Sequence, residues 1–151
     1  MSKIILKTTN LIICLLVSYT IGLACTCENR NTSAQEFETV DAAFSGKVTK
    51  MTEIKTENGL IEGYLVKFRV EQSWKFIDQS ELIIFTPGVG MCGYPFDVGE
   101  TYLIYASRKD RKELTTGICR KTAKLKYAKE ELKDLKNRKQ LKISKKGNTP
   151  L

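Results

Sequence analysis

The stretch GYLVKFRVEQSW at residues 63–74 decides the fold class. Every second residue from Tyr64 to Val70 is apolar, and the residues between them include Lys67 and Arg69. A repeat of two with one apolar side is typical of a β-strand that covers a core with one face and meets water with the other. This stretch therefore predicts a long strand with one buried face.

Four further segments around it have the composition of strands. They are AAFSGKV at 42–48, which 50–55 can continue, and the runs at 82–86, 101–106 and 114–119. Gly46 in the first of them predicts a bulge or tight bend, and Asn58-Gly59 is a strong short signal for a hairpin. Five short strands separated by Gly and Pro turns predict a small all-β barrel or sandwich.

Two helices are expected to flank the strands. Ser33 stands three residues before Glu36, which is the spacing of a capping box, and predicts a short helix over 33–40. Thr122 is expected to cap a C-terminal amphipathic helix, because apolar residues then recur at spacings of three and four. These residues are Leu125, Ala128, Leu132 and Leu135. From residue 139 onward the chain is polar and basic, and we expect a disordered tail.

The first 24 residues have the three parts of a secretory signal. Lys3 and Lys7 give a positive start, residues 11–21 are almost uninterrupted apolar sequence, and Ala24 precedes Cys25. The apolar run is too short for a comfortable membrane span. We expect a signal peptide over 1–24, a secreted domain over 25–138 and the basic tail over 139–151.

Positive charge is concentrated at the C-terminal end. Residues 25–119 hold 11 basic and 14 acidic side chains, a net charge of −3, whereas residues 120–151 hold 12 and 3, a net charge of +9. Such a segment can bind an acidic polysaccharide or a membrane surface, although most charge runs are solvated helix faces. We expect no specific nucleic-acid partner, and we expect a monomer.

The chain contains no histidine. This excludes Ser-His and Cys-His nucleophilic sites, His-ligated metal centres and imidazole acid–base catalysis. We therefore expect a binding protein and not an enzyme, with no cofactor of its own.

Four of the five cysteines remain once the signal is removed. An even number in a small exported protein indicates two disulfides. Cys25 cannot comfortably pair with Cys27 across a single residue, so each of the two pairs with Cys92 or Cys119, in one order or the other. As an alternative, Cys25 is the acylated first residue of a cell-surface lipoprotein. Gly22 argues against this, because lipid-attachment signals carry a bulky aliphatic residue at that position.

A mature chain that starts at Cys25 has metal-binding chemistry at its first residue. A free α-amine has a pKa of about 7.7–8.0, so it can lose its proton and offer a lone pair to a metal. The carbonyl oxygen of Cys25 then closes a five-membered chelate ring. Disulfides at Cys25 and Cys27 would hold the terminus rigid, which lowers the ordering cost of binding. The segment Cys25-Thr26-Cys27 is therefore the candidate functional site.

Over residues 25–122 the sequence resembles the N-terminal, netrin-like domain of the tissue inhibitors of metalloproteinases. The resemblance consists of CTC at 25–27, DAAFSGKV at 41–48, VKFRVEQSWK at 66–75, IIFTPGVGMCGYPFDVGETYLIYA at 83–106 and LTTGICRKT at 114–122, in that order. The Lys-rich chain resembles a bacterial-type member more than an animal one.

The resemblance implies a five-stranded OB-fold barrel and the inhibition of a zinc metalloproteinase. It implies that the amine and carbonyl of Cys25 chelate the zinc of the target protease, and that Thr26 enters the main specificity pocket. It also implies the pairings Cys25–Cys92 and Cys27–Cys119. The implied inhibitory contacts are Cys25, Thr26, Cys27, Glu28, Val89, Gly90 and Met91.

The chain departs from the family in three places. It has cysteines for two disulfides where the animal domain has three, and it has a Lys-rich segment in place of the cysteine-rich second subdomain. Glu28 and Asn29 follow the CTC sequence without the proline usual in animal members. A netrin-like extracellular module that binds other ligands and inhibits no protease is the alternative function.

Overall fold

The computed structural model describes residues 25–27, 31–108 and 113–147, and from residue 139 onward it describes the backbone only. The expected signal segment and Glu28 lie outside the described residues. No helix within the described part of the chain is both long enough and apolar enough to span a bilayer.

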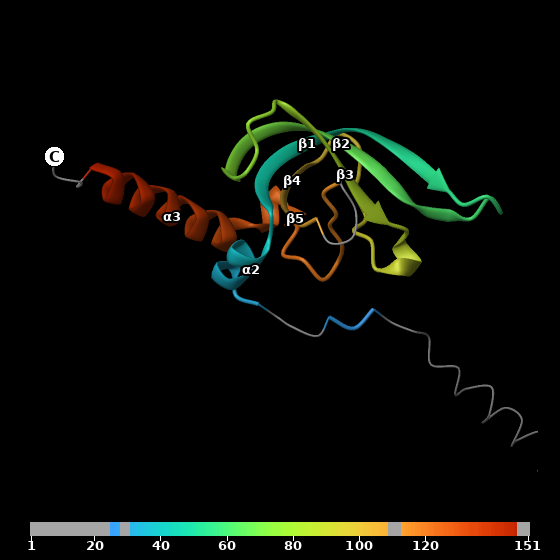
Figure 1. Cartoon of the computed structure of the whole chain (residues 1–151), viewed down its shortest axis with the longest axis horizontal. Coiled ribbons are helices and arrows are strands. Elements are labelled where there is room, and N and C mark those ends of the chain that lie inside the picture. The colour runs from blue at the N-terminus through green and yellow to red at the C-terminus, as the bar shows by residue number, and fades with distance from the viewer. Residues whose placement is uncertain (1–24, 28–30, 109–112, 148–151) are drawn as a thin grey trace, which may run out of the picture.

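The fold is built on one five-stranded antiparallel sheet (Figure 1). Its strands are β1 (Ala42–Lys55), β2 (Ile61–Lys75), β3 (Glu81–Pro87), β4 (Thr101–Ala106) and β5 (Ala123–Lys124). Their order across the sheet is β3-β2-β1-β4-β5. β1 and β2 form the long hairpin expected around Asn58-Gly59, and Gly59 has a φ of +79° in its turn. The predicted all-β class and four of the five predicted strands are confirmed.

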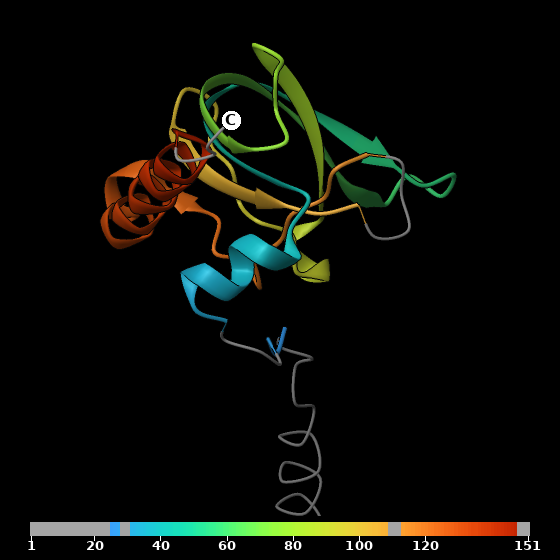
Figure 2. The same ribbon diagram turned by 60° about the vertical axis from the view of Figure 1, so that its left-hand side comes forward.

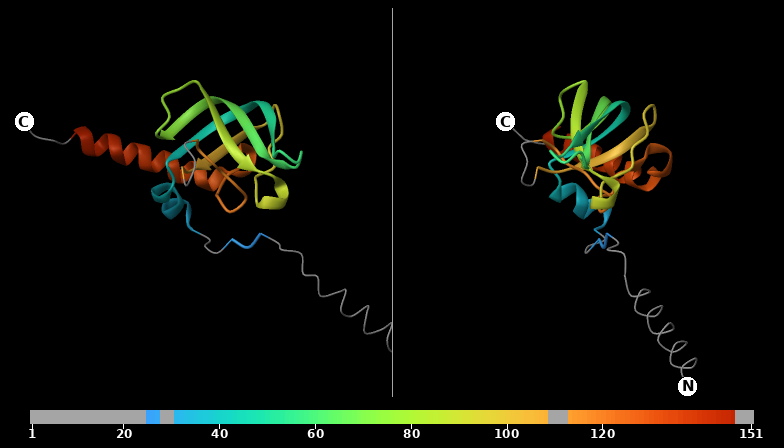
Figure 3. Two further views of the ribbon diagram at one scale, coloured as in Figure 1. Left: turned by 45° about the vertical axis from the view of Figure 1, so that its right-hand side comes forward. Right: turned by 90° about the vertical axis from the view of Figure 1, so that its right-hand side faces the viewer.

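The sheet curls so that β3 approaches the chain directly after β4, as Figures 2 and 3 show. Thr115 joins them, because it forms one β-bridge with Phe85 of β3 and another with Ser107, directly after β4. Backbone hydrogen bonds of 2.8–3.1 Å link the segment 114–116 to both neighbours. The expected bulge is confirmed, since the β1–β2 register shifts between Ser45 and Gly46.

The prediction of a fifth strand over 114–119 is wrong. Beyond Thr116, over the described residues 117–122, the backbone makes no strand pairing. The Ile118 amide donates to the carbonyl of Cys92, and the Arg120 amide donates to that of Gly117, which closes a turn. Cys119 is tied to Cys27 by a disulfide. These contacts turn the chain away from the sheet, and the fifth strand forms only at Ala123–Lys124.

The sheet has an apolar core on each side. Inside the curl, edge-to-face aromatic contacts join Phe44, Phe68, Phe96 and Tyr102. Outside it, Leu103 and Tyr105 of β4 pack with residues of the two flanking helices. β4 therefore buries both faces, which explains why its sequence is a continuous apolar run without alternation.

The short helix α2 (Ser33–Thr39) begins one residue earlier than its expected cap implies. Thr32 is the N-cap, and Gln35 completes the capping box. Glu36 does not serve as the capping residue, because its side chain is buried and hydrogen-bonded elsewhere.

The C-terminal helix α3 (Lys129–Gly147) begins several residues later than expected. The expected cap, Thr122, is buried, and its hydroxyl accepts a hydrogen bond from the amide of Tyr105. Residues Leu125–Tyr127 form a short 3₁₀ helix, η2, instead. The expected apolar stripe is nevertheless the docking face, since Ala128 and Leu135 are buried and Leu132 packs beside them. The backbone stays helical to Gly147, past the expected domain end at 138.

An ion pair fixes β5 to the turn that precedes β4. Lys124 Nζ lies 2.8 Å from Asp97 Oδ2, and this contact lowers the pKa of Asp97 and raises that of Lys124. The stabilisation from the Asp97 shift is lost as pH falls through its lowered pKa. That from the Lys124 shift is lost as pH rises through its raised pKa.

We predict that Leu135→Ala loosens α3 from the sheet. The side chain is 1% exposed, so its truncation leaves a cavity and should lower the free energy of unfolding by about 2–4 kcal/mol. Urea denaturation measures this change. Asn137→Ala, on an exposed position of the same helix, should change it by less than about 0.5 kcal/mol. Equal stability of the two variants would contradict the docking of α3.

Candidate functional site

The two disulfides attach the CTC segment to the sheet. Cys25 pairs with Cys92 and Cys27 pairs with Cys119, with Cα–Cα distances of 5.6 and 5.2 Å. This is one of the two pairings that the residues left open, and the one that the resemblance implies. Thr26 and Cys27 are exposed to solvent, and Cys25 is half-buried.

Cys92 ends a short 3₁₀ helix, η1 (Val89–Met91), that leads from β3 toward β4. Its φ of +66° is the left-handed conformation, which is uncommon for a residue other than glycine. The turn is closed at Gly88, whose carbonyl accepts hydrogen bonds from the amides of Met91 and Gly93. The disulfide thus holds Cys25 beside an exposed ridge formed by Val89, Gly90 and Met91.

Gly93 is required by the close approach of two backbone segments. A Cβ atom at this position would lie 1.6 Å from the carbonyl oxygen of Pro87, well inside van der Waals contact. The Tyr94 amide donates to the hydroxyl of the fully buried Thr86, 2.8 Å away. The ridge is therefore fixed to the end of β3 by packing as well as by the disulfide.

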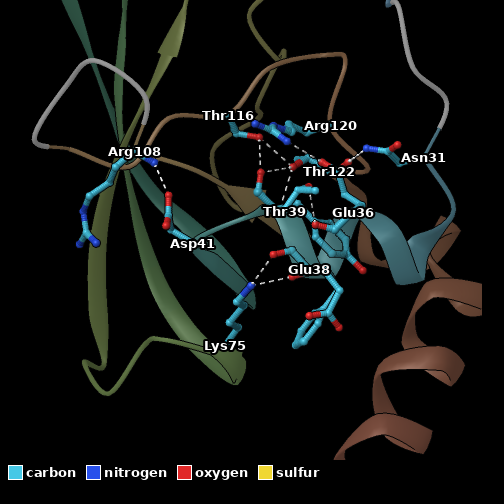
Figure 4. A network of polar contacts seen from close by, with 12 residues as sticks. Asn31, Glu36, Glu38, Thr39, Asp41, Lys75, Arg108, Thr116, Arg120 and Thr122 are labelled. Atoms are coloured by element: carbon cyan, nitrogen blue, oxygen red, sulfur yellow. Dashed lines mark hydrogen bonds and ion pairs between the residues drawn. The ribbon is translucent and has the colours of Figure 1, made fainter.

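A polar network surrounds Glu36 of α2 (Figure 4), beside a cavity that Cys25 and Cys27 also line. Glu36 is 3% exposed, and its carboxylate accepts hydrogen bonds from Asn31 Nδ2 at 3.3 Å and from Arg120 Nη1 at 3.2 Å. These residues line a cavity of about 440 Å³. The other residues of its lining are Cys25, Cys27, Ile118, Cys119 and Lys121. A buried carboxylate paired in this way joins α2 to the residue that follows Cys119.

An apolar groove adjoins the ridge on its other side. It has a volume of about 550 Å³ and runs between η1 and the far end of the β1–β2 hairpin. Leu60 and Ile61 on the hairpin are 69% and 41% exposed, and Val89 and Met91 on the ridge are 65% and 49% exposed. The Gly88 amide donates to the Glu62 carbonyl, which holds the two walls together. Exposed apolar side chains gathered around one groove are typical of an interaction surface.

The structure brings most of the expected contact residues to one end of the molecule. The disulfide places Cys25 beside Cys92 and the ridge, whereas Glu28 lies outside the described residues. Sequence reasoning missed the hairpin wall of the groove. The apolar pair Leu60-Ile61 directly after the Asn-Gly turn was an available signal, since hairpin ends are usually polar.

No group of three or more Cys, Asp or Glu side chains is placed to hold a metal ion within the described residues. The metal-binding atoms that the CTC segment can offer belong to the backbone, namely the α-amine and carbonyl of Cys25 in a chain that starts there. Two such atoms at the rim of an exposed ridge can complete the coordination of a metal held by another protein.

No known family model matches this sequence, and no characterised protein has a significantly similar one. The geometry and chemistry of the residues therefore carry the functional proposal.

We predict that Gly93→Ala destabilises the protein, because the added methyl group forces the backbone away from Pro87. The expected loss is about 2–4 kcal/mol, measured by denaturant unfolding. Gly90→Ala on the same ridge is the matched control, since nothing lies within 4 Å of the position that its methyl group would take. A Gly93→Ala protein as stable as the control would show that this approach is not needed.

Proposed function

We propose that the protein is a secreted inhibitor of zinc metalloendopeptidases, with an OB-fold of the netrin type. The observation that carries the proposal is the Cys25–Cys92 disulfide, which joins the CTC segment to the exposed ridge Val89–Met91. A curled sheet of five antiparallel strands, in which Thr115 bridges β3 to the chain directly after β4, is the arrangement expected of such a barrel.

The inhibitory chemistry follows from the first residue of the mature chain. A zinc endopeptidase holds its metal with three side chains and keeps a water molecule in the open position as its nucleophile. The amine and carbonyl of Cys25 would take the place of this water. The protease then loses its nucleophile, while the inhibitor offers no side chain of its own for catalysis.

The disulfides make this binding mode favourable. A free chain terminus loses conformational entropy when it binds in one orientation. Here Cys25 and Cys27 are both bonded to the folded domain, so much of this ordering has already taken place on folding. Thr26, exposed between the two disulfides, would enter the specificity pocket beside the zinc.

The apolar groove would extend the contact beyond the catalytic cleft. The ridge residues Val89 and Met91 form one wall of the groove and also flank the disulfide of Cys25. A protease whose cleft receives the CTC segment would therefore meet the groove at its rim. Leu60 on the hairpin wall would lose most of its exposed apolar surface in such a complex.

The chelation mechanism predicts that one extra alanine before Cys25 abolishes inhibition. The extension converts the free amine into an amide, which binds zinc poorly, and it displaces the chain by one residue. We expect the inhibition constant against a zinc endopeptidase to rise by at least about 100-fold. The measurement is inhibition of a panel of zinc endopeptidases by protein whose intact mass shows an unmodified Cys25 start.

The matched control carries one extra alanine after Leu151 and should inhibit as the natural chain does. Both variants should unfold at the same temperature. Unchanged inhibition by the N-terminal variant would refute chelation. A natural chain that starts at Cys25 and inhibits no member of the panel would favour a non-inhibitory netrin-like module. A lipid adduct on Cys25 would favour a cell-surface lipoprotein.

The groove predicts a second, smaller effect on inhibition. Leu60→Asp places a charge on the hairpin wall and should weaken inhibition by about 10- to 100-fold, because burial of a leucine side chain is lost. Ile83→Asp is the control, since Ile83 is 51% exposed and does not line the groove. Equal effects of the two substitutions would exclude the groove from the contact.

A further inference from the structure

The cations near the C-terminal helix fall into two groups. Arg120, Lys124 and Arg138 each pair with a carboxylate of the domain body at 2.8–3.2 Å, and so are neutralised. A second group makes no ion pair within the described part of the chain. It consists of Lys121, Lys126, Lys129, Lys133 and Lys136. The positive charge of these five lysines is therefore not neutralised by an ion pair within the described residues.

Three lysines of the second group share one side of α3. Lys129, Lys133 and Lys136 are spaced by four and three residues, which places them within about 60° around the helix axis. All three are exposed. The acidic residues of the helix lie on another side by the same spacing. They are Glu130, Glu131 and Asp134. The lysines thus form an uninterrupted row, which we call the lysine row.

The apolar side of α3 is already occupied. Ala128 and Leu135 are buried against the sheet and α2, and Leu132 packs beside them. An amphipathic helix that adsorbs to a membrane inserts a free apolar face between the lipids. The described part of α3 has no exposed apolar face of this kind. We therefore expect it to bind a partner through its charged side chains.

We propose that α3 binds an acidic polysaccharide along the lysine row. The helix has 19 residues and is about 28 Å long, so it presents its charges in a line. A single small anion would be held weakly at an exposed lysine, because water and salt screen the pair. A linear polyanion meets several lysines together and releases its condensed counterions, which favours a chain of repeated sulfate or carboxylate groups.

The sequence beyond the described side chains has the same character. Residues 139–147 continue α3 and include Lys139, Lys142, Lys145 and Lys146 without an acidic residue. In Figures 1 and 3 the helix leads away from the sheet on the side opposite η1. The lysine row and the proposed inhibitory ridge can therefore be occupied simultaneously, and the polysaccharide proposal does not depend on protease inhibition.

The test measures the affinity of the whole mature protein for heparin and for alginate over a range of NaCl concentrations. The variant is the triple substitution Lys129→Gln, Lys133→Gln and Lys136→Gln, because glutamine keeps helix propensity while it removes charge. We expect the affinity at physiological salt to fall by about 10- to 100-fold, and the slope of log affinity against log salt to flatten by about 2 to 3.

The control removes the same charge from β1 and β2 through Lys47→Gln, Lys50→Gln and Arg69→Gln, and it leaves Lys55 in place because Lys55 already pairs with Glu53. It should leave the affinity and the slope close to those of the natural chain. Equal losses in the two triple variants would show that net charge alone is responsible and would overturn the proposal. Unaltered binding by the α3 variant would also overturn it. Binding to phosphatidylglycerol vesicles without binding to either polysaccharide would assign the helix to a membrane surface instead.

Discussion

The structure depends on the covalent attachment of residues 25–27 to two distant loops. The disulfides close loops in which the paired cysteines are 67 and 92 residues apart, and each is expected to contribute about 2–5 kcal/mol by restricting the unfolded chain. Without them, residues 25–27 would have no covalent link to either loop. With them, the same residues become part of the domain surface, beside the ridge at Val89–Met91.

The disulfides can act in this way because the loops that receive them are themselves fixed. Cys92 is held in a left-handed conformation between the Gly88 turn and Gly93, which packs against Pro87. Cys119 follows the segment in which Thr115 bridges β3 to the chain directly after β4. The candidate site is therefore held by the curled sheet, to which the two disulfides connect residues 25–27.

The two faces of β4 pack against different parts of the molecule. Tyr102 and Ile104 face the interior of the curled sheet, whereas Leu103 and Tyr105 support α2 and α3 outside it. The disulfides and the apolar groove lie toward η1, and the lysine row lies on the helix that leads the other way. Exposed apolar side chains surround the groove at one end and lysines line the helix at the other, so the two ends suit partners of different chemistry.

The sequence by itself determined the local features of this protein. The alternation around Phe68, the bulge at Gly46, the hairpin at Asn58-Gly59 and the apolar stripe of α3 could all be predicted, because each depends on neighbours within a few residues. The four cysteines that follow the expected signal segment and the lack of histidine likewise limited the chemistry without any knowledge of the fold.

Only the tertiary structure decided how distant segments meet. Cysteine spacing allowed two pairings, and the closure of the sheet selected one of them by placing Cys92 and Cys119 beside Cys25 and Cys27, respectively. The predicted roles of Glu36 and Thr122 as caps failed for the same reason. The carboxylate of Glu36 accepts a hydrogen bond from Arg120, 84 residues away in the sequence. The hydroxyl of Thr122 accepts one from the amide of Tyr105, 17 residues away. A capping pattern is a local preference worth about 1 kcal/mol, and burial with a distant partner outweighs it.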